Sequence, residues 1–195
     1  MVQRQRVRTV RVGDNLPPPV GLLACIRVSV GQGVGSRTED PLRADWVLPR
    51  IPASAGALVW DRKGRLLILK PTYKSGWTIP GGVVEADGES PWEACRREAR
   101  EECGLDLRRG RLACVDFLRP RPGRPGGMRF LFDCGVLNDP KLADIVLQKD
   151  EISAYRLARV DRALRLLSGP VRRRVTAAVR KPARTHDLED GRPVR

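Results

Sequence analysis

The stretch from Arg97 to Leu105 holds the side chains best suited to chemistry, because it places three glutamates at helical spacing. Residues three or four positions apart share one face of an α-helix, so Glu98, Glu101 and Glu102 lie close together. Like charges at positions i and i+4 destabilise an isolated helix by roughly 0.2–0.5 kcal/mol per pair. A hard divalent cation would turn that repulsion into binding, since Mg²⁺ prefers oxygen ligands and keeps positions for water and substrate phosphate. The spacing indicates a carboxylate metal site, and a solvated charged face is the alternative for such a run taken alone.

These glutamates need a helix to align them, and the sequence predicts one from Ser90 to Cys103. Ser90 can cap its start, Pro91 suits the first helical position, and Glu93 can complete a capping box. Gly104 follows the last helical residue, where a left-handed backbone conformation is favoured. The caps at both ends therefore fix the limits of the helix.

Further elements surround this helix in an order typical of an α/β domain. Strands are expected at Ala55 to Trp60, Arg65 to Lys70, Leu112 to Leu118, Met128 to Val136 and Ile152 to Leu157. The turn Asp61 to Gly64 joins the first two, which predicts a hairpin. Helices are expected at Val160 to Leu167 and Val171 to Val179.

The surroundings of the glutamates resemble the signature of the Nudix hydrolases, written G-x5-E-x7-R-E-U-x-E-E-x-G-U with U an apolar residue. The matching positions are Gly82, Glu89, Arg97, Glu98, Ala99, Glu101, Glu102, Gly104 and Leu105. The residues of this signature are called the box below. The segment from Trp77 to Gly82 is similar to the sequence that usually precedes the box in the family. So many fixed positions make a far stronger signal than a lone glycine-rich loop.

One position departs from the family pattern. Six residues separate Gly82 from Glu89, where the signature has five. The extra residue falls in the turn before Ser90, so the helix-borne acids keep their spacing. The placement of Gly82 and the role of Glu89 depend on how that turn is built.

The resemblance implies an α/β fold in which a mixed β-sheet is sandwiched between α-helices. We expect this domain at residues 46–180, after a basic, Pro/Gly-rich and flexible extension at residues 1–45. Residues 181–195 are expected to form a charged, disordered tail. The family cleaves a diphosphate linkage in a nucleoside diphosphate joined to another group, with Mg²⁺ or Mn²⁺ as the cofactor.

The resemblance also implies roles within the box. Glu98 and Glu102 are the expected principal metal ligands, and Glu101 is a third ligand or an activator of water. Gly82 lies near the metal in the family. Arg97 is expected to orient the acids rather than touch the substrate, since it stands at i, i+4 spacing from Glu101.

Other side chains are candidates for catalysis or substrate binding. Glu151 is the candidate for a downstream acid that serves as the general base, and a surface acid or strand cap is an equal alternative. Arg121, Arg124 and Arg129 can grip substrate phosphate, because a guanidinium group binds phosphate in a bidentate manner. A solvated hairpin loop is the alternative for these arginines. Trp77 can stack on a base, although a tryptophan at such a place more often belongs to the core.

Composition restricts the classes of protein and partner. A net charge of +14 and a pI of about 10.7 suit polyanionic partners, including a nucleotide-type diphosphate substrate. The five cysteines form no CxxC pair and His186 is the only histidine, which disfavours zinc sites and Ser-His-Asp schemes. A reducing cytoplasm is the expected compartment. No apolar run is long enough to cross a membrane.

Two alternative functions remain open at this point. A non-catalytic nucleotide-sensing or nucleic-acid-binding module on the same fold would suit the basic charge. The retention of every box acid disfavours that reading, and no aromatic residues are interleaved with basic ones for stacking single strands. An isomerase of the same fold would need a catalytic cysteine and acid that the sequence does not place. The substrate and the oligomeric state, with a homodimer among the options, stay open.

Overall fold

The computed structural model describes residues 50–138, 142 and 144–194 of the chain. The predictions for the extension at residues 1–45 lie outside these residues.

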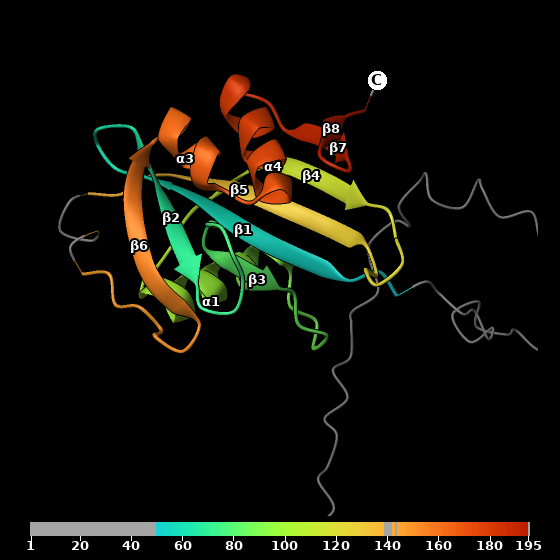
Figure 1. The fold of residues 1–195 in the computed structure, drawn as a ribbon, viewed down its shortest axis with the longest axis horizontal. Helices are drawn as coiled ribbons and strands as arrows, with labels where there is room; N and C mark the ends of the chain where they lie inside the picture. Colours follow the sequence, from blue (N-terminus) through green and yellow to red (C-terminus); the bar gives the residue numbers. More distant parts are fainter. Residues whose placement is uncertain (1–49, 139–141, 143, 195) are drawn as a thin grey trace, which may run out of the picture. The chain divides into compact units, whose positions relative to one another are not determined.

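Eight strands of the described residues form one mixed sheet (Figure 1). They are β1 (Ala53–Trp60), β2 (Arg65–Pro71), β3 (Gly81–Val83), β4 (Arg111–Leu118), β5 (Gly127–Val136), β6 (Ile152–Arg159), β7 (His186–Glu189) and β8 (Arg192–Pro193). The strand order is β6-β2-β1-β5-β4-β7-β8, and β3 pairs with β1 beside this path. Strands β1 and β5 run parallel, as do β4 and β7, whereas the other pairs are antiparallel. The antiparallel pairing of β1 with β2 confirms the predicted hairpin.

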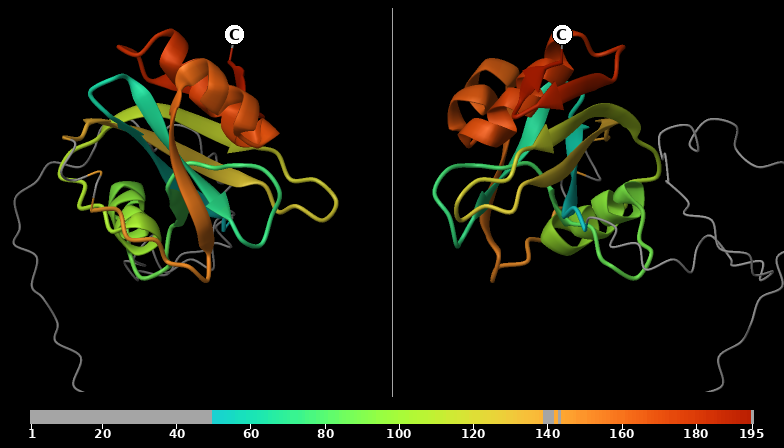
Figure 2. Two further views of the ribbon diagram at one scale, coloured as in Figure 1. Left: turned by 60° about the vertical axis from the view of Figure 1, so that its left-hand side comes forward. Right: turned by 90° about the vertical axis from the view of Figure 1, so that its right-hand side faces the viewer.

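Helices cover both faces of this sheet (Figure 2). Helix α1 (Pro91–Cys103) packs on β1, β3 and β5. Helices α3 (Val160–Leu166) and α4 (Gly169–Arg180) lie on the other face, where α3 contacts β2 and β6 and α4 contacts β4 and β7. This arrangement confirms the predicted sheet between helices. Among the described residues, no helix combines the length and the apolar character needed to cross a membrane.

The central strands are apolar on both sides because both of their faces are covered. In β2, Leu67 and Leu69 point into the core beneath α1, while Leu66 and Ile68 point into the core beneath α3 and α4. All four side chains are fully buried. The alternation of a strand therefore supplies two separate hydrophobic cores from one continuous apolar run.

Helix α1 begins and ends where the sequence predicts. The Glu93 amide donates to Ser90 Oγ at 3.2 Å, and the Ser90 amide donates to Glu93 Oε2 at 2.8 Å, which completes the capping box. Gly104 ends the helix with φ at 70°, a value that suits glycine. Ala99 and Glu102 lie on the buried face, so the helix directs one carboxylate into the protein.

The expected disorder of residues 181–195 is wrong for the part that the structure describes. Strand β7 pairs in parallel with β4, and β8 pairs with β7. Leu188 is fully buried in the core beneath α4. Two acids of this segment are paired as well, since Arg119 forms ion pairs with Glu189 and Asp190. The charge of the segment suggested solvation, but one buried leucine and long-range charge pairing dock it on the sheet.

The packing of this segment on the sheet predicts the effect of shortening the Leu188 side chain. The Leu188→Ala variant should lower the free energy of unfolding by about 2–4 kcal/mol, because it leaves a cavity in a closed core. Val194→Ala is the control, since Val194 is 48% exposed and its loss should change stability by less than about 0.5 kcal/mol. Urea unfolding monitored by tryptophan fluorescence measures both. Equal midpoints for Leu188→Ala and the wild type would mean that β7 does not pack on β4.

Candidate active site

The Glu102 carboxylate is buried where helix α1 meets strand β3. Its side chain faces the sheet, only 4% of the residue is exposed, and the Gly81 amide donates to its Oε2 at 2.7 Å. Burial raises the pKa of Glu102 to about 7; the Gly81 hydrogen bond opposes this rise, and the charges of Glu98 and Glu151 add to it. An ionised Glu102 is therefore stabilised by any cation that reaches it.

The Glu98 carboxylate lies against the next residue of β3. A Cβ atom at Gly82 would overlap the Glu98 carboxylate, so only glycine allows the approach. Burial raises the pKa of Glu98 as well, although a hydrogen bond from Arg97 Nη1 at 2.9 Å opposes the rise. Two consecutive glycines thus bring two carboxylates of α1 onto one short strand.

Arg97 holds the box together from its outer side. Its Nε donates to Glu89 Oε1 at 2.8 Å, its Nη1 donates to Glu101 Oε2 at 3.0 Å, and its Nη2 donates to the Val83 carbonyl at 2.9 Å. The hydrogen bond with Glu89 is the main cause of the raised pKa of Arg97. The guanidinium group therefore links β3, the turn and the helix, and its expected contact with Glu101 is present.

The extra residue between Gly82 and Glu89 is accommodated in a turn at residues 86–88. Gly88 adopts a φ of 98°, which the turn requires. Glu89 still reaches Arg97, and its Oε2 accepts a hydrogen bond from the Glu85 amide at 2.9 Å. The departure from the signature leaves the contacts of the box acids in place.

Glu151 approaches the box from a distant part of the sequence. It is exposed in the turn before β6, and its carbonyl accepts a hydrogen bond from the Thr72 amide at 2.8 Å. Its charge is close enough to raise the pKa of both Glu98 and Glu102. Glu151 therefore acts on Glu98 and Glu102 through its charge, and in the described residues it does not complete a three-carboxylate cluster with them.

A cavity of about 330 Å³ opens beside the two glycines of β3. Its lining includes Gly81 and Gly82 as well as Lys74, Arg129 and Arg174. Of the four side chains expected to bind substrate, Arg129 is the one that lines this cavity.

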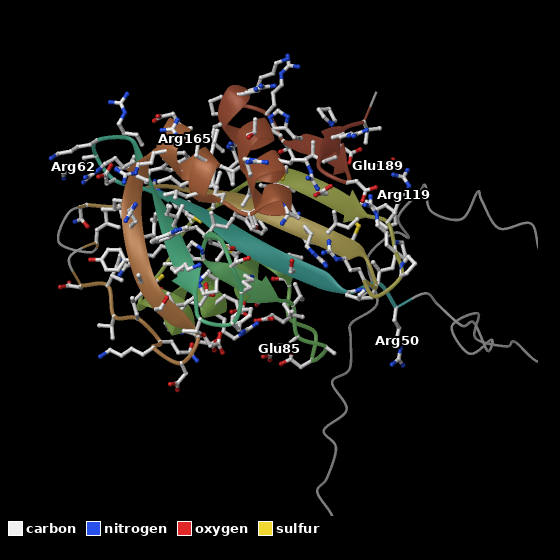
Figure 3. The ribbon with its side chains drawn as sticks, viewed as in Figure 1. Arg50, Arg62, Glu85, Arg119, Arg165 and Glu189 are labelled. Atoms are coloured by element: carbon white, nitrogen blue, oxygen red, sulfur yellow. The ribbon has the colours of Figure 1, made fainter. Side chains whose placement is uncertain are left out.

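The other three lie elsewhere. Arg121 forms an ion pair with Asp190 at 3.2 Å, near the contact of Arg119 with Glu189. Figure 3 shows Arg119 and Glu189 together at one end of the sheet, well apart from Glu85 in the box turn. Arg124 is exposed in the same loop as Arg121. Trp77 packs against the core beneath α3 and α4, and Arg156 lies 5.1 Å from the centre of its ring.

Sequence reasoning missed Lys74, Arg174 and the buried Asp116. Arg174 Nη1 donates to Asp116 Oδ2 at 3.1 Å. A signal for this pair was present in the sequence. Asp116 follows Cys114 at the two-residue spacing of one strand face, and Arg174 precedes the buried Ala178 by one helical turn.

Glu98 and Glu102 are the side chains that fit a divalent cation. Within the part of the chain that the structure describes, no three acidic, histidine or cysteine side chains converge as a ready-made metal cage. Glu101 does not join the other two, because its side chain is half exposed whereas that of Glu98 is largely buried. Two carboxylates nevertheless suit Mg²⁺, which is usually held by one or two carboxylates together with water and substrate phosphate.

The raised pKa of Glu102 predicts a pH dependence of stability for the metal-free protein. The folded state binds the Glu102 proton more tightly than the unfolded state does. Protonation of Glu102 therefore stabilises the folded state fully below the usual pKa of 4.5, and this stabilisation is lost as the pH rises through about 7. At pH 8, Glu102→Gln should therefore be more stable than the wild type by up to about 3 kcal/mol. At pH 4 the two should agree. Urea unfolding in the presence of a chelator measures the difference, and an equal gap at both pH values would contradict the prediction.

Known proteins match parts of this chain. A NUDIX domain family model matches residues 50–179. An RNA pyrophosphohydrolase of Gluconacetobacter diazotrophicus is 39% identical over 62 residues, which cover 27% of this chain and 36% of that protein. The matched part is thus about a third of that relative's length.

Solved structures show the same fold. The MutT protein of Methanosarcina mazei Go1 is 26% identical, with a TM-score of 0.58 over 68% of this chain and 96% of that chain. An Ap4A hydrolase of C. elegans is 22% identical, with a TM-score of 0.54 over 68% of this chain and 98% of that chain. The family model matches more than half of the residues of this chain, and the chain therefore belongs to the NUDIX domain family.

Proposed function

We propose that this protein hydrolyses a phosphoric anhydride bond in a nucleoside diphosphate that is linked to another group, and that it uses Mg²⁺ or Mn²⁺. The observation that carries the proposal is the packing of Glu98 and Glu102 against Gly82 and Gly81 beside an open cavity. A hydrolase of such bonds needs a cation site next to room for a nucleotide, and β3 is shared by both features.

The chemistry explains the need for this arrangement. A diphosphate resists hydrolysis mainly because its negative charge repels the attacking water. A divalent cation, when bound, neutralises that charge and lowers the pKa of water. Glu98 and Glu102 would hold the cation, and the burial of both carboxylates strengthens their attraction to it.

The remaining box residues would position these ligands and handle the proton. Arg97 fixes the outer side of the helix through Glu89 and Glu101, so it orients the acids without contact to substrate. Glu151 is our candidate for the group that accepts the proton of the attacking water, since its charge reaches Glu98 and Glu102 from an exposed turn. Glu101 is the second candidate for that role.

The comparisons support the reaction class and leave the substrate open. The relative from Gluconacetobacter diazotrophicus is named an RNA pyrophosphohydrolase, which favours a pyrophosphohydrolase reaction on a nucleotide-type substrate. We also propose a reducing, cytoplasmic location. In its favour, Cys95, Cys103, Cys114 and Cys134 are buried free thiols.

The first test is hydrolysis of a nucleotide panel with Mg²⁺ or Mn²⁺. The panel contains nucleoside triphosphates, ADP-ribose, dinucleotides, sugar nucleotides and 5′-triphosphate RNA. Cleavage of at least one member should require the cation and should fall at least about a hundredfold in Glu102→Gln, a loss of roughly 2.7 kcal/mol of transition-state stabilisation. Asp161→Asn is the control, because Asp161 is exposed and pairs with Arg159 and Arg165 away from the box. Nucleotide binding without any cleavage would instead favour a non-catalytic module.

The second test separates the proton acceptor from the cation ligands. The Glu151→Gln variant should lose about a hundredfold or more in kcat while it keeps the wild-type affinity for Mn²⁺. Asp150→Asn is a matched control, since Asp150 is its exposed neighbour in the same turn. An unchanged kcat in Glu151→Gln would remove this residue from the reaction and leave Glu101 as the candidate.

A further inference from the structure

Within the described part of the chain, the cavity beside β3 is lined by three cationic side chains and by no carboxylate. Lys74, Arg129 and Arg174 contribute to the lining, and its other residues are neutral. The box acids lie just behind the same strand, since Glu102 accepts a hydrogen bond from Gly81. Strand β3 therefore separates a negative site on α1 from a positive cavity to which α4 contributes.

Arg129 is held in place by backbone carbonyls. Its Nη1 donates to the Met128 carbonyl at 2.9 Å and to the Pro52 carbonyl at 3.3 Å, and its Nη2 donates to the Gly126 carbonyl at 3.0 Å. Among the described residues, no carboxylate forms an ion pair with it. These contacts fix the direction of the guanidinium group and leave its charge without an anionic partner.

Arg174 reaches the same cavity from helix α4 and is even more enclosed. Its side chain is 14% exposed, and its partner Asp116 is completely buried. The other oxygen of Asp116 accepts a hydrogen bond from the Gly191 amide at 2.8 Å, in the turn between β7 and β8. The C-terminal strands therefore help to hold Arg174 in position.

The sheet register brings these charges close together. Asp116 of β4 is the direct cross-strand partner of Arg129 of β5, and such partners point to the same face. The pKa of Arg129 is lowered by burial first and by the charge of Arg174 second. Asp116 thus pairs with Arg174, and among the described residues the charge of the half-buried Arg129 guanidinium group has no ion-pair partner.

An uncompensated cation in a partly buried site is costly unless an anion joins it. Phosphate suits this position, because its oxygens match the planar fork of a guanidinium group. Lys74 stands at the exposed edge of the same cavity, where an ammonium group can add attraction without fixed geometry.

We infer that Arg129 and Arg174 bind a phosphate group that the substrate carries in addition to the diphosphate that is cleaved. The substrate class is then a nucleotide with a further phosphate monoester on the part that enters the cavity. This inference rests on the proposed function for its place in a reaction, but the binding of the extra phosphate is a property of the cavity itself.

Direct binding tests the cavity without any need for hydrolysis. Isothermal titration calorimetry at fixed ionic strength would compare adenosine 5′-monophosphate with adenosine 3′,5′-bisphosphate and adenosine 2′,5′-bisphosphate. At least one bisphosphate should bind the wild type about tenfold more tightly or better, the gain expected of one charge-assisted contact. In Arg129→Met this preference should fall to near one. Arg62→Met is the matched control, because Arg62 is exposed in the β1–β2 turn and should keep the preference (Figure 3).

A second variant distinguishes a lost phosphate contact from a loss of folding. Arg174→Lys keeps a charge near Asp116 but removes the fork, so it should stay folded and lose most of the preference for the bisphosphate. Equal affinity of the wild type for the monophosphate and both bisphosphates would overturn the inference. A preference that survives in both Arg129→Met and Arg174→Lys would overturn it as well.

Turnover then separates this inference from the proposed function. NAD⁺ and NADP⁺ differ by one phosphate, as do dephospho-coenzyme A and coenzyme A. If these pairs are cleaved, kcat/KM should favour the phosphorylated member, and Arg129→Met should abolish the preference through KM. Cleavage of both members at equal kcat/KM would overturn the inference and leave the hydrolase intact. Selective bisphosphate binding without cleavage of any nucleotide would support phosphate binding in the cavity and contradict the proposed hydrolase function.

Discussion

The burial of the Glu102 carboxylate under strand β3 is the interaction on which the site depends. Helix α1 can approach this closely only because β3 is made of glycine at two consecutive positions. A side chain at Gly82 would overlap Glu98, and one at Gly81 would overlap the backbone of β1 at Ala55. The glycines therefore let β3 contact the helix on one side and β1 on the other. Burial disfavours the charged form of such a carboxylate because it removes water, and a nearby divalent cation favours the charged form again.

Strand β3 lies between two local groups of charged side chains. Acidic side chains gather on α1, where Arg97 is the cation that keeps them in register. Cationic side chains gather in the cavity, where Asp116 is the acid that aligns Arg174. In each group, a residue of opposite sign fixes the geometry of its neighbours: Arg97 on α1 and Asp116 at the cavity. The C-terminal strands join this scheme through Gly191, so a segment remote from the box contributes to the cavity.

Local signals explain which parts of this arrangement could be predicted from the sequence. Ser90, Glu93 and Gly104 specify helix α1 through contacts within a few residues, and the helix then aligns Glu98 with Glu102. The docking of β7 could not be predicted in this way, because it depends on pairing with β4 and on one buried leucine in a charged segment. The role of Arg174 was not predicted from the sequence for a similar reason. It stands in a run of three arginines, and its position one helical turn before Ala178 is a weak signal until the buried partner on β4 is known.

The central claim is that Glu98 and Glu102 hold a divalent cation at β3. Electron paramagnetic resonance measures it directly, through titration of the metal-free protein with Mn²⁺. The wild type should bind the ion saturably, and its affinity should fall about tenfold or more in both Glu98→Gln and Glu102→Gln, because each variant removes a charged oxygen ligand. Asp161→Asn should bind as the wild type does. Equal Mn²⁺ affinity in the wild type and in both glutamine variants would contradict the account.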